Sequence, residues 1–123
     1  MKYVVCVLLL LLTSCGDNLQ VTEKDLEKYP EIQSFLFEIQ EFKGVHNMDL
    51  ATLDFSYAIS KSQDSVFLIL DSVAKREKWM VYLKSDKKRV YTKYIQSFPA
   101  DEDIDSLIIT YNNDEKRIYY RWN

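Results

Sequence analysis

Residues 107–122 read LIITYNNDEKRIYYRW, and this stretch decides the fold class. Two runs rich in aliphatic and aromatic residues, 107–111 and 117–122, flank the polar segment 112–115. Asn- and Asp-rich segments of this length accommodate the tight backbone that joins two antiparallel strands. The stretch therefore predicts a β-hairpin at the C-terminal end of the chain.

Upstream of it lies a second segment with the same organisation. Residues 79–84 and 89–95 are rich in apolar and aromatic side chains and flank the polar residues 85–88, which predicts another hairpin. Between the two hairpins, residues 98–105 contain Pro99 and four acidic residues, which indicates a longer loop.

Further upstream, alternation with a period of two predicts a strand over 53–59, where Leu53, Phe55, Tyr57 and Ile59 share one face. The apolar run 66–70 is ambiguous, because its periodicity does not separate a buried strand from a helix. Its β-branched and aromatic content favours a strand, which we expect here, whereas the helix-forming residues 74–78 favour the helical alternative.

A helical period is found only near the start of the predicted domain. Pro30 is suited to the first turn of a helix, and Gly44 to its end. Thr22 and Asp25 form a loose capping pair before a short helical turn. The intervening apolar residues, which predict an amphipathic helix over 31–42, are Ile32, Phe35, Leu36, Ile39 and Phe42.

These elements predict an α+β fold within a single globular domain over residues 23–123. We expect the N-terminal amphipathic helix to pack on a five- to six-stranded antiparallel meander. A small β-barrel capped by the helix is the alternative.

Composition excludes several classes of protein. The chain has 123 residues, which suits one domain, and its 14% aromatic content excludes disorder for most of it. One His and two Cys are too few for most multi-ligand zinc or iron–sulfur sites. His46 stands alone in a predicted loop, and no Gly-rich phosphate loop is present in the sequence. We therefore expect no catalytic site, no bound metal and no cofactor.

The first fifteen residues read MKYVVCVLLLLLTSC. Lys2 precedes an apolar run that is too short for a permanent membrane span. The end of the run, Leu12-Thr13-Ser14-Cys15, resembles the lipobox of bacterial lipoproteins. The resemblance implies that residues 1–14 are a signal peptide, that cleavage falls between Ser14 and Cys15, and that Cys15 is acylated.

Acylation of Cys15 implies a membrane anchor, because two or more acyl chains bind a bilayer stably. Residues 15–22 would form the lipidated tether between the membrane and the domain. In enteric bacteria, Asp directly after the lipidated Cys retains such proteins at the inner membrane. The residue here is Gly16, which favours the outer membrane over the inner one. An exported location also argues against a nucleic-acid partner.

Charge is unevenly distributed along the chain. Residues 75–93 contain eight basic and two acidic residues, and residues 97–115 contain six acidic residues and no basic one. If the two segments lie side by side in the sheet, they partly neutralise each other. Lysines at hairpin tips and on edge strands also discourage edge-to-edge aggregation.

The last predicted strand supplies the candidate binding face. Tyr119 alternates with Arg117 and Arg121 on one face of that strand, and Tyr82 adds an aromatic side chain from a neighbouring one. Tyr and Arg are enriched where proteins bind one another. The sequence thus predicts a non-enzymatic, membrane-anchored lipoprotein that binds a protein partner or serves as an accessory module of the cell envelope. The alternative is a lipoprotein that binds a small ligand or a lipid.

Overall fold

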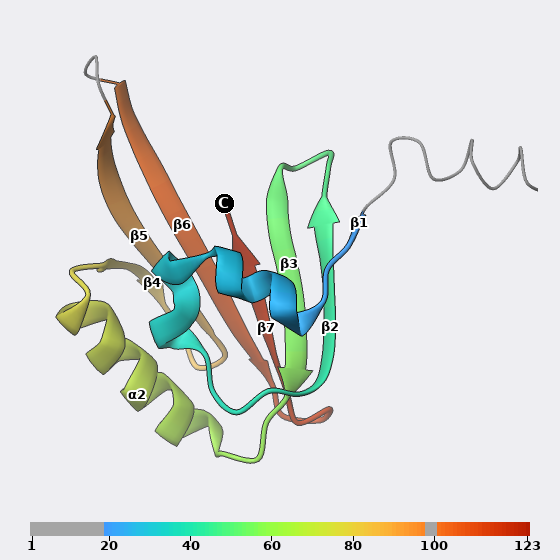
Figure 1. Ribbon diagram of the computed structural model, residues 1–123. Coiled ribbons are helices and arrows are strands. Elements are labelled where there is room, and N and C mark those ends of the chain that lie inside the picture. The colour runs from blue at the N-terminus through green and yellow to red at the C-terminus, as the bar shows by residue number, and fades with distance from the viewer. Residues whose placement is uncertain (1–18, 98–100) are drawn as a thin grey trace, which may run out of the picture.

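The computed structural model describes residues 19–97 and 101–123, and this part of the chain forms one seven-stranded antiparallel sheet (Figure 1). One α-helix and two 3-10 helices lie on the same side of the sheet. In chain order the elements are β1 (Leu19–Gln20), η1 (Glu23–Lys28), η2 (Pro30–Phe35), β2 (Gln40–Asn47), β3 (Thr52–Ala58), α2 (Gln63–Arg76), β4 (Met80–Lys84), β5 (Lys88–Ser97), β6 (Asp101–Asn112) and β7 (Arg117–Trp122).

The spatial order of the strands is β1-β2-β3-β7-β6-β5-β4. The sheet therefore consists of two meanders, β1–β2–β3 and β4–β5–β6–β7, that are joined where β3 pairs with β7. Helix α2 connects β3 to β4 at the far edge. The predicted α+β class is confirmed. The predicted single meander of five or six strands is wrong, and so is the barrel alternative, because the sheet is open with β1 and β4 at its edges.

Both predicted hairpins are confirmed. β6 pairs with β7, and β4 pairs with β5, each in antiparallel register. In the turn between β6 and β7, Asn112 Oδ1 accepts hydrogen bonds of 3.0 Å from the backbone N–H groups of Asp114 and Glu115. Lys116 closes the turn with a φ of 53°. A short polar side chain that satisfies nearby N–H groups is the reason that Asn favours such turns.

The predicted loop over 98–105 is shorter than expected. Strand β6 already begins at Asp101, and Asp101 pairs with Ser97 of β5. The acidic residues of this segment therefore belong to a strand. Lys93 of β5 stands directly opposite Asp105 of β6, so the basic and acidic segments do lie side by side.

The predicted helix over 31–42 is wrong. Only Pro30–Phe35 is helical, as the 3-10 helix η2, and Leu36 already has extended dihedrals. A tertiary contact replaces the next helical hydrogen bond, because the N–H of Phe37 donates to the hydroxyl of Tyr57 at 2.8 Å. The helix therefore ends at Phe35, and its two buried residues are Ile32 and Phe35.

Phe42 and Gly44 lie in a strand, although the sequence pattern placed them in a helix and at its end. Phe42 belongs to β2, and its ring stacks on that of Phe55 with centroids 5.9 Å apart. Gly44 lies in the middle of the same strand, beneath Phe42. A Cβ atom at Gly44 would lie 2.8 Å from the Phe42 ring and 3.2 Å from Phe55 Cβ. Gly44 is thus needed because the Phe42 ring packs closely against it within the strand, and it does not end a helix.

The expected strand over 66–70 is also wrong, because these residues lie within α2. Ser62 caps this helix by accepting a hydrogen bond from the N–H of Ser65, and Lys75 and Arg76 in the last turn complement the helix dipole. The buried side chains recur at helical spacing: Val66, Phe67, Leu70, Val73 and Ala74. The helix period is visible only when the residues after 70 are included.

The N-terminal part of the domain differs from the expected tether. Thr22 caps η1 as predicted, since its N–H and its hydroxyl both donate to Asp25 Oδ2, at 2.8 and 3.1 Å. These hydrogen bonds lower the pKa of Asp25. Leu19 and Gln20, which were expected in the tether, pair with β2 and extend the sheet by one short strand.

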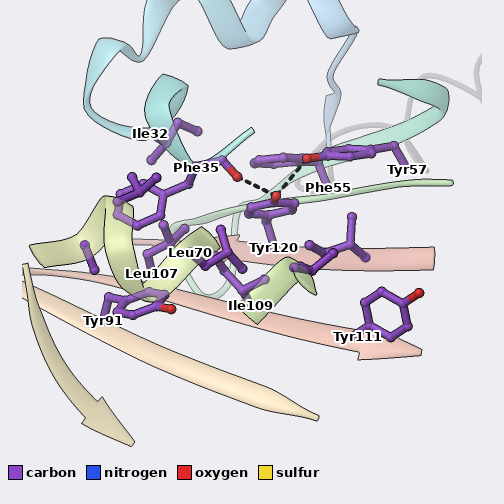
Figure 2. Packing of buried hydrophobic residues seen from close by; sticks show 14 of the residues in the cluster. Ile32, Phe35, Phe55, Tyr57, Leu70, Tyr91, Leu107, Ile109, Tyr111 and Tyr120 are labelled. Atoms are coloured by element: carbon purple, nitrogen blue, oxygen red, sulfur yellow. Dashed lines mark hydrogen bonds between the residues drawn. The ribbon is translucent and has the colours of Figure 1, made fainter. Parts of the chain in front are cut away.

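A group of aromatic residues forms the centre of the core (Figure 2). The rings of Phe55 and Tyr120 stack with centroids 4.6 Å apart and planes inclined by 8°. The Tyr120 hydroxyl donates to the backbone oxygen of Phe35 at 2.6 Å and lies 2.7 Å from the Tyr57 hydroxyl. Burial raises the pKa of Tyr57 to about 12. This chain of polar atoms joins η2 to the two central strands, β3 and β7.

We expect Tyr120→Phe to lower the free energy of unfolding by about 1–3 kcal/mol, because it leaves buried polar partners in Phe35 and Tyr57. Urea denaturation measures the change. Tyr119→Phe is the matched control, since its hydroxyl contacts only the exposed Glu115 carboxylate, and we expect a loss below about 0.5 kcal/mol. Equal losses in the two variants would contradict this role of Tyr120.

Candidate functional site

A cavity of about 560 Å³ lies between α2 and the β4–β5 hairpin. The lining residues of α2 lie between Gln63 and Asp71, and those of the hairpin lie between Lys84 and Arg89. The residues that line the cavity are Gln63, Asp64, Phe67, Leu68, Asp71, Lys84, Ser85, Asp86 and Arg89. Its wall is therefore mixed, with acidic, basic and apolar side chains.

Asp71 is the centre of a polar network in this cavity. Its carboxylate accepts a 3.1 Å hydrogen bond from Arg89 Nε and a 2.7 Å one from the Tyr91 hydroxyl, and Lys84 Nζ lies 3.5 Å away. The guanidinium of Arg89 also donates to the Ser85 backbone oxygen, and it lies 4.3 Å from the centroid of the Phe67 ring. Each of these contacts joins α2 to the hairpin or closes the hairpin turn.

Burial makes this network sensitive to substitution. Arg89 is only 7% exposed, so its charge requires the nearby carboxylate. Desolvation raises the pKa of Tyr91, and the hydrogen bond to Asp71 and its negative charge raise it further. Tyr91 thus remains a neutral donor, and the network holds protons in place instead of releasing them. We assign it the task of docking α2 against β4 and β5.

The four residues of the predicted binding face do not form one surface. Arg117 is only 8% exposed: its Nε donates to Ser56 Oγ at 2.9 Å, and its Nη2 donates to the Glu41 backbone oxygen. Arg121 is half-exposed and forms a bidentate ion pair with Asp54, at 2.9 and 3.1 Å. Both arginines are therefore used in holding β7 against β3.

Tyr119 and Tyr82 are the exposed tyrosines of that set, but they lie far apart. Tyr119 is on β7, on the face of the sheet opposite the core, and its hydroxyl donates to Glu115 at 2.8 Å. Tyr82 is on β4, with β6 and β5 between the two strands. Three strand spacings amount to about 14 Å. Tyr82 consequently belongs to a different surface, the edge of the sheet.

The β4 edge is a run of exposed, mostly apolar residues. All five residues of β4 are exposed, and among them Tyr82 reaches 77%. A register shift between Val81 and Leu83 marks a bulge at Tyr82. β4 pairs with β5 on one side, and no strand from residues 19–97 or 101–123 pairs with its other side. The exposed apolar side chains of this edge are Met80, Val81, Tyr82 and Leu83.

Sequence reasoning identified this strand but not its position. The pattern over 79–84 predicts half of a hairpin whether the strand lies at the centre or at the edge of a sheet. The four consecutive residues Met80–Leu83 break the strict alternation of a half-buried strand, and this was the available signal. Strand order depends on long-range pairing, which the local pattern does not contain.

The remaining candidates of the sequence have other structural settings. His46 lies in β2, not in a loop, and its Nε2 lies 3.0 Å from the Tyr29 hydroxyl. In the described part of the chain, no three His, Cys, Asp or Glu side chains are grouped so as to hold a metal ion. Nor does any helix there have the length and apolar character that a membrane span requires. The predicted signal peptide, residues 1–14, and the predicted acylation site Cys15 lie outside the described residues.

Comparison of the chain with protein-family models, curated proteins and solved structures gave no match.

We expect Asp71→Asn to lower the free energy of unfolding by about 2 kcal/mol, because the buried Arg89 loses its counter-charge. Thermal or urea unfolding measures the loss. Asp86→Asn serves as the matched control: Asp86 lines the same cavity from the exposed turn, and its replacement should change stability by less than about 0.5 kcal/mol. If Asp71→Asn is as neutral as the control, the docking role is refuted.

Proposed function

We propose that the chain is a lipid-anchored protein of the bacterial cell envelope whose domain binds a protein partner along the β4 edge and has no enzymatic role. The observation that carries the proposal is the β4 edge itself, with four exposed apolar side chains in a row, Met80–Leu83. The anchor is Cys15, proposed from its lipobox-like surroundings.

Edge strands favour a particular kind of partner. The outer side of β4 offers backbone N–H and C=O groups, and an extended segment of another protein can add to the sheet by pairing with them. Side chains that alternate along β4 then provide specificity. An exposed Tyr with aliphatic neighbours supplies contact area of the kind that dominates binding energy.

Basic residues next to β4 indicate that the partner segment carries acidic residues there. Lys84 ends the strand, Lys87 lies in the turn, and Lys88 begins β5. All three are exposed. We therefore propose an extended partner segment with apolar side chains along β4 and acidic residues where it reaches the β4–β5 turn.

The inner face of the sheet offers less support for a small-ligand carrier. In a carrier of this architecture the concave face would hold the ligand. Here the side chains of Tyr91, Leu107 and Ile109 on that face are fully buried, and η2 and α2 pack over them (Figure 2). Partner binding at the β4 edge is accordingly the function that we favour.

The anchor is tested by Cys15→Ala. We expect this variant to remain an uncleaved precursor or to yield an unacylated product, because the thiol is the site of lipid attachment. Metabolic labelling with a fatty acid, followed by membrane fractionation, measures both effects. Cys6→Ala is the matched control and should leave acylation intact, since Cys6 lies within the predicted signal peptide. Mature, acylated protein from Cys15→Ala would contradict the anchor.

The β4 edge is tested by photo-cross-linking in intact membranes. A benzoylphenylalanine at position 82 should capture one protein in stoichiometric amount, whereas the same residue at position 119 should not, because only Tyr82 lies on β4. Leu83→Lys should reduce the capture at position 82 about tenfold, since a charge on the edge opposes strand pairing.

Two results would count against this proposal. Capture from position 119 but not from position 82 would place the partner on the face of the sheet opposite the core. No capture from either position would contradict partner binding at both surfaces. Circular dichroism and thermal unfolding of each variant verify that the domain remains folded.

A further inference from the structure

Three exposed apolar side chains lie at the end of the sheet where the described chain begins. They are Leu19 in β1 and Met48 and Leu50 in the turn between β2 and β3, and each is 54–56% exposed. We call these three residues the tether tip. Single exposed apolar residues are normal on protein surfaces, whereas a group of them at one place indicates a contact.

The strand register brings the three residues together. β1 runs antiparallel to β2, and Leu19 pairs with His46. Met48 follows His46 by two residues, or about 7 Å along a strand. The N–H of Leu50 donates to Asn47 Oδ1 at 3.1 Å, which folds the turn back toward β3. Figure 1 shows β1 beside the end of β2 that leads into this turn.

Aromatic side chains support the tip from within. The Tyr29 hydroxyl lies 3.0 Å from His46 Nε2, and the Tyr29 ring meets that of Trp122 edge-on, with centroids 5.0 Å apart. Trp122 pairs with Leu53 at the start of β3. These contacts join Tyr29, between η1 and η2, to β2 and β7 behind the tip, so that its surface has a rigid base.

The length of chain before Leu19 places the tip near the proposed anchor. Cys15 precedes Leu19 by four residues, which span at most about 14 Å when fully extended. An acylated Cys15 lies at the bilayer surface, and therefore Leu19 remains within that distance of it. A surface held so close to a membrane by a covalent anchor meets it at a high effective concentration.

We infer that the tether tip inserts into the interfacial layer of the lipid bilayer and fixes the orientation of the domain on the membrane. This inference rests on the proposed acylation of Cys15. In the interfacial layer, apolar side chains reach the boundary between headgroups and acyl chains, and polar groups remain hydrated. The layer therefore accepts Met48 and Leu50 together with the carboxylate of Asp49, which stands between them.

The orientation has a consequence for the partner surface. β1 and β4 are the two edges of the sheet, six strand spacings or about 29 Å apart. A domain that contacts the bilayer through the tether tip, at the β1 corner of the sheet, leaves the β4 edge about that far from the point of contact. The same contact thus makes the proposed partner surface accessible.

The test uses the acylated protein in vesicles of phosphatidylethanolamine and phosphatidylglycerol. Leu50→Cys and Leu68→Cys each receive an environment-sensitive fluorophore. Leu68 is the matched control, because it is also an exposed leucine, 72% exposed, but lies on α2. We expect a lipid-borne nitroxide to quench the label at position 50 at least about twofold more than the label at position 68. Aqueous iodide should show the opposite preference.

Co-flotation with the vesicles distinguishes failure of the proposed acyl anchor from failure of the tether tip. Protein that does not float would overturn both the anchor and the tip. Floating protein whose label at position 50 is as open to iodide as that at position 68 would overturn the tip alone and leave the anchor standing. Strong lipid quenching at both positions would also overturn the tip, because the contact would then not be specific to it.

Discussion

The antiparallel pairing of β3 with β7 is the interaction on which the rest of this structure depends. It joins the last strand of the chain to the third and so combines two meanders into one sheet. α2 must then cross the inner face to reach β4, where it covers the core. The hydroxyl of Tyr120, on β7, connects the same pair of strands to η2 through Phe35. Strand pairing and helix packing therefore meet at one residue.

The same pairing decides which surfaces are available for function. Because β7 occupies the place beside β3, β1 and β4 become the edges of the sheet. The β1 side carries the chain toward the proposed anchor, and the β4 side carries exposed apolar residues. Arg117 and Arg121 lie on β7 in the interior of the sheet and are occupied by Ser56, Glu41 and Asp54. Central strands provide stability here, and edges provide the surfaces proposed for binding.

Local patterns predicted the hairpins well and the helices poorly, for a physical reason. Hairpins combine alternation with a polar turn, as at Asn112, and both signals lie within a few residues of each other. Residues Ile32 to Phe42 have a helical period, but the helix ends after Phe35, where the Tyr57 hydroxyl accepts the hydrogen bond from the N–H of Phe37. The run 66–70 has strand composition, but its buried residues belong to a longer helical repeat that ends at Ala74.

The sequence by itself determined the α+β class, two hairpins, the strand at Thr52–Ala58 and the cap formed by Thr22 and Asp25, because each depends on neighbouring residues. Only the tertiary structure decided the order of the strands, the burial of Arg117 and the exposure of Tyr82. Residues distant in sequence set these properties: Ser56 and Glu41 bury Arg117, and α2 carries the chain from β3 to the edge where Tyr82 lies. Long-range pairing, which local spacing does not encode, therefore distinguishes a structural arginine from a residue that is free to bind.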